Sequence, residues 1–306
     1  MTTASDWWAG ARPRTLPAAV VPVVVGWAVA YRAAHGEGRA AGIYDVEAID
    51  VGVTWWRVVA ALAVSLLLQI GVNYANDYSD GVRGTDDVRV GPMRLVASGR
   101  ASPGAVKRAA LAVFGLAALV GLALAATTSW WLIVVGLAAI LAAWGYTGGP
   151  RPYGYLGLGE VFVFTFFGLV ATVGTTYVAI GHVPDVAWPA AVGVGLLACA
   201  LLVVNNLRDI PTDTAAGKRT LAVRLGDART RWFYVVLVVG AAACAVICAG
   251  WRPWAALGVV ALAVAIQPVK AVLGGAKGPA LIPVLGGTGK VQLAYGSLLA
   301  IGLLIG

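Results

Sequence analysis

The sequence is poor in charge and in the residues that usually build metal or redox centres. Only 12% of its 306 residues are charged, acids are outnumbered by bases (14 against 22), and there are three cysteines and two histidines. The cysteines all lie in apolar runs, which indicates packing, and the histidines lie far apart, which excludes a metal–histidine cluster. With 60% hydrophobic residues, this composition excludes an ordinary soluble domain.

The apolar residues occur in runs of helix length that are rich in alanine, leucine and valine. Such runs predict an all-α, polytopic membrane protein. We expect a single domain over residues 1–306, with nine transmembrane helices at approximately 15–32, 55–76, 104–126, 129–146, 157–181, 187–207, 230–250, 252–271 and 289–306.

The positive charges are distributed unevenly over the two sides of this predicted bundle. Only four of the 22 lysines and arginines (Arg32, Arg39, Arg57 and Arg252) fall on the side opposite the N-terminus. The positive-inside rule therefore predicts an N-in, C-out topology. The same distribution explains the net charge of +8 without nucleic acid as a partner.

A first polar motif follows the second predicted span. Asn73, Asn76, Asp77 and Asp80 are spaced i, i+3, i+4, i+7, which places them on one stripe of a helix. Two carboxylates and two carboxamides that leave the bilayer together form an oxygen-rich site suited to Mg²⁺. Two solvated helix ends would be the simpler explanation, but acids at a membrane edge are costly and usually mark function.

A second such motif ends the sixth span. Asn205, Asp209 and Asp213 are spaced i, i+4, i+8, although Pro211 predicts a helix break between the last two. Asp77 and Asp209 each close the second helix of a four-span unit, so we expect two four-helix pseudo-repeats plus a ninth span. This arrangement brings the two acidic sites face to face across a pocket.

Facing acid clusters with arginines and lysines in the adjoining loops indicate a magnesium–diphosphate site. Its position above an apolar bundle suits a lipid with an anionic head, such as a polyprenyl diphosphate.

Two further segments on the same side of the predicted bundle each have two possible roles. Arg12 and Arg14 are either positive-inside residues or contacts to an anionic substrate. The loop from Tyr146 to Tyr155 is either a structural turn or a contact to an aromatic ring or diphosphate. Glu160 is a lone buried acid candidate.

Several stretches resemble a known family: Asn76-Asp-Tyr-Ser-Asp80-Gly, Asp209-x-x-x-Asp213, the arginine–proline run 12–17, Gly91-Pro-Met-Arg94 and Tyr146-Thr-Gly-Gly-Pro-Arg-Pro. They are similar to the aspartate-rich motifs of the UbiA superfamily of intramembrane prenyltransferases, most of all the 1,4-dihydroxy-2-naphthoate polyprenyltransferases. The resemblance implies prenyl transfer from a polyprenyl diphosphate to 1,4-dihydroxy-2-naphthoate, with loss of the carboxylate, giving demethylmenaquinone. It also implies that the protein is located in a bacterial plasma membrane, with its active site facing the cytoplasm.

The resemblance, together with the chemistry of a diphosphate site, assigns roles to individual residues. Two Mg²⁺ ions are expected, one on Asp77 and Asp80 and the other on Asp209 and Asp213. The family's first motif has a further aspartate where this chain has Gly84. Asp86 is the candidate replacement, with Asp87 beside it, and either of the two would position or deprotonate the ring hydroxyl. The expected substrate-binding residues are Asn73, Asn76, Arg83, Arg94, Tyr146, Arg151, Tyr153, Asn205, Asn206, Arg208 and Lys218.

Three alternatives to this interpretation exist. Another aromatic acceptor, such as 4-hydroxybenzoate, homogentisate or chlorophyllide, fits the same spacing. A cation transporter should carry its charges near mid-bilayer, whereas these motifs lie at the rim. In a CDP-alcohol phosphotransferase, an Ala-Arg pair would be needed where this chain has Gly84-Thr85.

Overall fold

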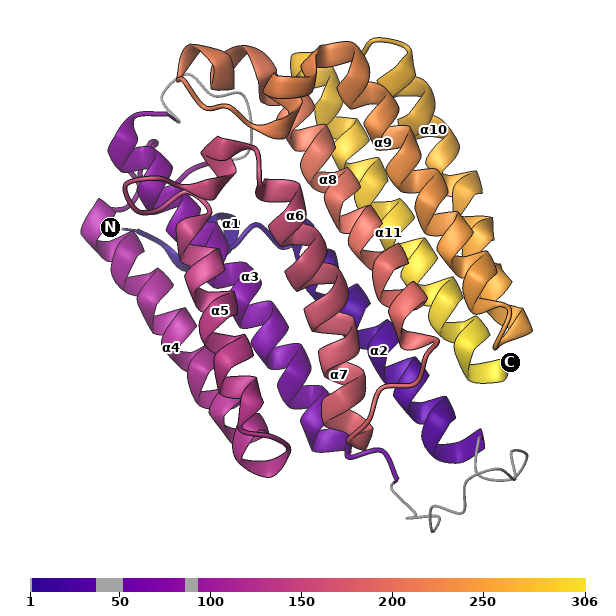
Figure 1. Cartoon of the computed structure of the whole chain (residues 1–306). Helices are drawn as coiled ribbons and strands as arrows, with labels where there is room; N and C mark the ends of the chain where they lie inside the picture. Colours follow the sequence, from indigo (N-terminus) through magenta and orange to yellow (C-terminus); the bar gives the residue numbers. More distant parts are fainter. Residues whose placement is uncertain (1, 37–51, 86–92) are drawn as a thin grey trace.

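The protein is described here from a computed structural model that covers residues 2–36, 52–85 and 93–306. Within these ranges it is helical throughout and contains no strand (Figure 1). The elements are α1 (Ala4–Gly10), η1 (Pro13–Thr15), α2 (Pro17–Gly36), α3 (Trp55–Arg83), α4 (Pro103–Thr127), α5 (Trp131–Gly145), η2 (Tyr153–Leu156), α6 (Gly159–Val163), η3 (Phe164–Val170), α7 (Ala171–Ile180), α8 (Ala187–Ala215), α9 (Leu221–Cys248), η4 (Pro253–Val260), α10 (Ala261–Leu273), η5 (Gly278–Ala280) and α11 (Leu281–Ile305).

The helices confirm the predicted all-α, multi-pass membrane architecture. Eight helical segments of the described chain are long and apolar enough to cross a membrane. The remaining predicted span, 129–146, corresponds to α5, which is apolar but only 15 residues long. The count of nine spans and the N-in, C-out orientation remain predictions.

Helix α8 lies at the centre of the larger hydrophobic core. Two-thirds of the most apolar 18-residue stretch of α8 is buried, against 28% of the corresponding stretch of α4. The difference arises because α8 packs on α9 and α11, whereas α4 lies at the edge of the bundle. A second, smaller core joins α1, α3 and α4. The two motif-bearing helices therefore belong to different packing units.

The predicted helix break at Pro211 is wrong. Helix α8 continues through Pro211 to Ala215. Proline removes one N–H donor near the end of the helix, and threonine hydroxyls on the same turns donate to backbone carbonyls, with Thr212 Oγ1 donating to the carbonyl of Asp209 at 3.0 Å. The uninterrupted helix keeps Asp209 and Asp213 one turn apart on the same face.

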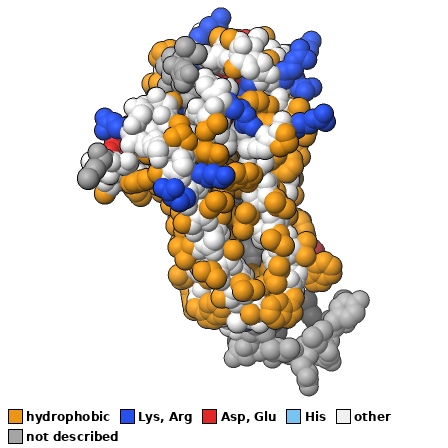
Figure 2. All heavy atoms as spheres, turned by 90° about the vertical axis from the view of Figure 1, so that its left-hand side faces the viewer, with side chains coloured by type: hydrophobic (Ala, Val, Ile, Leu, Met, Phe, Trp, Pro, Cys, Tyr) orange, Lys and Arg blue, Asp and Glu red, His pale blue; other side chains and the backbone are white. Residues whose placement is uncertain are grey.

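Helices α3 and α8 are each 29 residues long, and both end at the same end of the bundle. In Figure 2, lysine and arginine side chains gather at this upper end, while hydrophobic side chains cover the lower part of the visible face. The common end of the two helices is where the polar motifs meet.

The span formed by α6, η3 and α7 departs from α-helical geometry in its middle, where Phe164–Val170 is π-helical. Gly168 allows this segment to lie directly on α8, because a Cβ at this position would be 2.6 Å from the Cα of Gly195. Such π segments are frequent at functional sites, and this one borders the cavity described next.

Candidate active site

A cavity of about 340 Å³ lies between α2, α3, α4, α5, the α6–α7 span and α8. Its wall is polar at the motif end and apolar further along the bundle. The polar lining comprises Arg12, Ser65, Gln69, Asn73, Asn76, Asp80, Arg94, Tyr146, Thr147, Tyr153, Thr175, Asn205, Asn206 and Lys218; the apolar lining includes Leu124, Leu132, Val135, Phe162, Phe166, Phe167, Val170 and Val178. A single cavity thus joins both motifs to a hydrophobic interior.

The two aspartates of the first motif have different environments. Asp80 lines the cavity, whereas Asp77 has no exposed surface and does not contribute to the wall. The Asp77 carboxylate instead accepts hydrogen bonds from the backbone N–H groups of Leu95 and Val96, at 2.8 and 3.0 Å. Asp77 therefore holds the turn that carries Arg94 into the cavity wall.

The same turn is fixed from the other side by the N-terminal helix. Arg100 Nη1 lies 2.9 Å from Asp6 Oδ1, and Asp6 also forms a capping box with Thr3 at the start of α1. Hydrogen bonds from Thr3 hold the pKa of Asp6 below its ordinary value, so this carboxylate stays charged at neutral pH. Asp6 and Asp77 together anchor the 94–101 segment.

The two asparagines of the first motif bind neighbouring segments. Asn73 Nδ2 donates to the carbonyl of Ala11 at 2.9 Å, and Asn76 Oδ1 accepts from Thr147 Oγ1 at 2.7 Å. The stripe on α3 thus joins the N-terminal turn to the loop after α5, and both segments contribute to the cavity wall.

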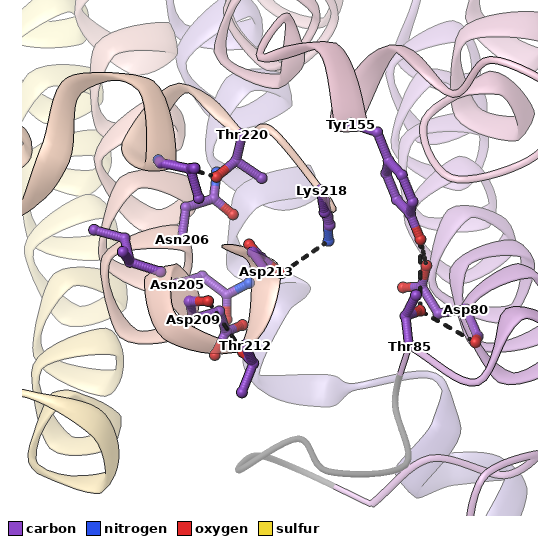
Figure 3. A network of polar contacts seen from close by, with 12 residues as sticks. Asp80, Thr85, Tyr155, Asn205, Asn206, Asp209, Thr212, Asp213, Lys218 and Thr220 are labelled. Atoms are coloured by element: carbon purple, nitrogen blue, oxygen red, sulfur yellow. Dashed lines mark hydrogen bonds and ion pairs between the residues drawn. The ribbon is translucent and has the colours of Figure 1, made fainter. Parts of the chain in front are cut away.

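Tyr155 links the two motifs across the cavity mouth. Its hydroxyl donates to Asp80 Oδ1 at 3.0 Å, and its ring lies 5.2 Å from the ammonium of Lys218 and 5.5 Å from the guanidinium of Arg83. Figure 3 shows Tyr155 and Asp80 on one side, with Lys218 between them and the second motif. Burial, and then the charge of Asp80, raise the pKa of Tyr155 to about 12, so it remains a donor at neutral pH.

The acids of the second motif are paired with cations. Arg208 makes a bidentate pair with Asp209, with Nε and Nη2 at 2.7 and 2.8 Å from the two carboxylate oxygens. Lys218 Nζ lies 3.7 Å from Asp213 Oδ1 (Figure 3). Asn206 donates to Glu160 Oε1 at 3.1 Å, which places the predicted buried acid directly behind the wall.

Tyr146 shows that both motifs act on one space. It lies at the end of α5, in the cavity wall. The same cavity is lined by Asp80 from α3 and by Asn205 and Asn206 from α8. Residues of both motifs therefore border one space, with Tyr146 in its wall.

Part of the wall is a row of stacked aromatic rings. Tyr153 and Phe162 stack with centroids 3.8 Å apart, and Phe162 and Phe166 stack at 6.3 Å. All three line the cavity. The row leads from the loop after α5 down into the π-helical segment, so an aromatic surface borders the path from the polar mouth to the apolar interior.

A model of the UbiA prenyltransferase family matches residues 48–275. The chain belongs to the UbiA prenyltransferase family. A protein named 1,4-dihydroxy-2-naphthoate octaprenyltransferase from Mycobacterium tuberculosis is 48% identical over 306 residues, covering 100% of this chain and 99% of that protein. The protein of the same name from Escherichia coli is 38% identical over 78% of this chain and 74% of its own length.

The fold is also that of solved members of the UbiA family. A UbiA homologue from Archaeoglobus fulgidus, solved with geranyl diphosphate (GPP) and Mg²⁺, aligns with a TM-score of 0.67 at 15% identity, over 96% of this chain and 99% of that one. At this identity the likeness concerns the fold alone. It confirms that the UbiA arrangement of helices is the one adopted here.

The positions of the predicted site residues in this UbiA-family chain fall into three groups. Those that line the cavity are Asn73, Asn76, Asp80, Arg94, Tyr146, Tyr153, Asn205, Asn206 and Lys218. Those that are close to it but engaged with protein partners are Asp77, Arg83, Arg208, Asp209 and Asp213. Arg151 is exposed and does not contribute to the wall, and Asp86 and Asp87 lie outside the described residues.

The partners of the second group explain their position. Arg83 donates to the carbonyls of Thr147 and Gly149, so it braces the loop after α5, and the predicted diphosphate contact finds no support in its position. Arg208 is likewise occupied by Asp209 and Asn205.

The wall residues Arg12, Gln69 and Thr147 were missed as site residues or left open, and so was Tyr155, which bonds to Asp80. Tyr155 lies two residues after Tyr153, in the loop that the sequence analysis describes as a possible substrate contact. This position in the loop was the sequence feature that could have identified Tyr155 as a site residue.

Proposed function

We propose that the chain catalyses Mg²⁺-dependent transfer of a polyprenyl group from polyprenyl diphosphate to 1,4-dihydroxy-2-naphthoate. The ring carboxylate is lost, and the product is demethylmenaquinol, the quinol form of demethylmenaquinone. The names of the relatives that match nearly the whole chain support this acceptor. The protein acts as one intramembrane unit of a bacterial plasma membrane, with the cavity mouth facing the cytoplasm.

The observation that carries the proposal is the two-part cavity. Its mouth is formed by acids, amides and cations of both motifs, and its interior by aliphatic and aromatic side chains. A water-soluble substrate would leave the apolar part unfilled, and a simple hydrocarbon would leave the polar part without a partner. A polyprenyl diphosphate fits both parts at once.

The mouth fits the proposed Mg²⁺. Its potential ligands are carboxylate and carboxamide oxygens, which Mg²⁺ prefers. Among the described residues, no three acids, histidines or cysteines lie close enough to hold a metal by themselves. This agrees with an ion bound through one or two carboxylates plus substrate phosphates and water. Asp80 would hold one ion and Asp209 with Asp213 a second; when bound, Mg²⁺ neutralises the negative charge of the diphosphate.

The chain's own cations assist departure of the diphosphate. Lys218 and Arg94 line the mouth and would bind diphosphate oxygens, Lys218 as a point charge and Arg94 through its planar fork. Their attraction grows as the allylic C–O bond breaks and its electron pair leaves with the diphosphate. Tyr155, which remains protonated, holds Asp80 in place during this step.

The aromatic row would protect and stabilise the resulting allylic cation. The rings of Tyr153, Phe162 and Phe166 line the cavity and would exclude water, and the ring faces that are not covered by a neighbouring ring supply negative electrostatic potential. Electrons of the hydroxylated ring form the new C–C bond. As CO₂ leaves, the electrons of the ring–carboxylate bond restore the aromatic system, so the products balance as prenylated quinol, CO₂ and diphosphate.

The test is an incubation of membranes that contain the protein with labelled prenyl diphosphate, 1,4-dihydroxy-2-naphthoate and Mg²⁺, with and without a chelator. We expect chelator-sensitive formation of the prenylated quinol, identified by mass spectrometry, and equimolar release of diphosphate and CO₂. A panel with 4-hydroxybenzoate and homogentisate determines the acceptor. Cation flux without acceptor-dependent diphosphate release would rule out the enzyme.

A further inference from the structure

Arg12 has an unusual backbone conformation. Its φ of 54° and ψ of 69° lie in the left-handed region, and it is the only non-glycine residue with positive φ in the described chain. This conformation is unfavourable for a residue with a Cβ, and the following Pro13 restricts Arg12 further. Such strain persists only where surrounding contacts impose it, and it occurs preferentially at functional sites.

The contacts that impose this conformation come from residues of the cavity itself. The carbonyl of Arg12 accepts from both the backbone N–H and the hydroxyl of Thr15, at 2.9 Å each. Gln69 Nε2 donates to that hydroxyl at 2.8 Å, and Asn73 Nδ2 donates to the carbonyl of Ala11 at 2.9 Å. Two amide side chains of α3 thus fix the turn on both sides of Arg12.

The side chain that this turn presents has an unused donor in the cavity wall. Arg12 lines the cavity, and its Nη2 is buried with no hydrogen-bond partner in the described chain. A buried guanidinium N–H without an acceptor is costly. A ligand that offers oxygen acceptors to the guanidinium would remove this cost, so the geometry indicates an anionic group bound beside Arg12.

The depth of Arg12 separates it from the diphosphate site. Towards the end of α3, the polar residues that line the cavity follow each other as Gln69, Asn73, Asn76 and Asp80. With a rise of 1.5 Å per residue, Asn73 lies roughly 10 Å from Asp80 along the helix axis. The Arg12 turn is bonded to Asn73 and Gln69, whereas Asp80 and Lys218 form the mouth. An anion at Arg12 is therefore a second one, deeper than the diphosphate.

We propose that Arg12 binds the carboxylate of the aromatic acceptor and thereby selects carboxylated rings. This assignment rests on the proposed function, in which the acceptor is an aromatic acid. The planar guanidinium matches a carboxylate through two parallel hydrogen bonds. Held in this way, the ring lies between Arg12 and the mouth, on the path of the allylic carbon.

The test compares a carboxylated ring with the same ring lacking the carboxylate. Binding of 1-hydroxy-2-naphthoate and of 1-naphthol to the purified protein is measured by tryptophan fluorescence. Wild type should prefer the naphthoate. Arg12→Gln should weaken naphthoate binding by roughly 10- to 100-fold, the effect expected for a lost charged hydrogen bond, while naphthol binding and the KM for prenyl diphosphate stay within about twofold.

Two further variants separate a role in binding from a role in folding. Arg12→Gly suits the left-handed backbone and should raise or maintain the melting temperature, yet lose the preference for the naphthoate. Arg14→Gln is the matched control, because Arg14 is exposed on the same turn and does not line the cavity; it should change neither property.

The proposal is overturned if wild type shows no preference for the carboxylated ring, or if Arg12→Gln and Arg12→Gly retain that preference. It is also overturned if Arg12→Gln weakens binding of prenyl diphosphate instead of naphthoate, because Arg12 would then belong to the diphosphate site. Should 4-hydroxybenzoate prove to be the acceptor, the proposed function changes, and the pair 4-hydroxybenzoate and phenol decides the role of Arg12.

Discussion

The two polar motifs have similar sequences but different surroundings. On α3, Asp77 is bound by two backbone N–H groups and Asp80 by a tyrosine hydroxyl. On α8, Asp209 is paired with Arg208 and Asp213 with Lys218. A carboxylate held by neutral donors keeps its charge available for a metal, whereas one paired with a cation is already partly neutralised. We therefore expect Asp80 to make the larger contribution to Mg²⁺ binding.

The largest loss of turnover should come from Asp80→Asn. Loss of the cavity-facing carboxylate should reduce turnover on the order of 10³-fold, because diphosphate departure depends on charge held at the mouth. Product formation is measured across a Mg²⁺ titration, and the Mg²⁺ concentration for half-maximal activity should rise. Asp185→Asn, at an exposed acid in the connection between α7 and α8, should behave as wild type. Near-normal turnover of Asp80→Asn would contradict the metal assignment.

Asp209→Asn should also abolish most activity, but with a loss of stability. It leaves the guanidinium of Arg208, whose side chain is 2% exposed, without its bidentate partner, which costs about 3–5 kcal/mol. The double variant Arg208→Gln with Asp209→Asn should recover part of the melting temperature and none of the activity. Recovery of both would show that Asp209 acts only as the partner of Arg208.

A smaller loss of activity is expected for Asp77→Asn. The new amide N–H₂ would face one of the two backbone N–H groups, so the free energy of unfolding should fall by about 1–3 kcal/mol, and limited proteolysis should cut the 94–101 segment faster. The Mg²⁺ concentration for half-maximal activity should stay within about twofold of wild type. A shift as large as that of Asp80→Asn would make Asp77 a metal ligand after all, as the sequence alone predicted.

The smallest effect is expected for Tyr155→Phe. Loss of its hydrogen bond to Asp80 should lower activity by roughly fivefold, corresponding to about 1 kcal/mol. Because the pKa of Tyr155 is raised from 10.0 to about 12, the unfolded chain loses this proton first, and stability should fall as pH rises through this interval. Chemical unfolding between pH 9 and pH 12 should show a weaker decline for Tyr155→Phe, and an identical decline would exclude this linkage.

The sequence was sufficient for the features that depend on local periodicity. The spans follow from apolar runs of helix length, and the stripe from Asn73 to Asp80 follows from helical spacing. What spacing could not show is which oxygens face the cavity. Asp77 lies on the stripe, but its partners, the N–H groups of Leu95 and Val96, come from a turn 18 residues later in the chain, and their position depends on tertiary packing.

Arg12 and Pro211 illustrate the same limit. The left-handed conformation of Arg12 is imposed by Gln69 and Asn73, which no local pattern around residue 12 contains. Proline predicts a helix break from its own chemistry, yet packing of α8 against α9 and α11 keeps the helix intact. In both cases contacts between distant segments outweigh the local preference.

The π-helical segment Phe164–Val170 makes the register of the aromatic row dependent on a single residue. Removing one residue there would rewind the segment as an ordinary α-helix, and every side chain before it would rotate by about 100° relative to those after it. Phe162 would then turn away from the substrate path while the hydropathy of the span hardly changed. Two homologues with equally hydrophobic sequences would thus differ in the length of the isoprenoid chain that they accept, through one insertion or deletion in the π-helical segment.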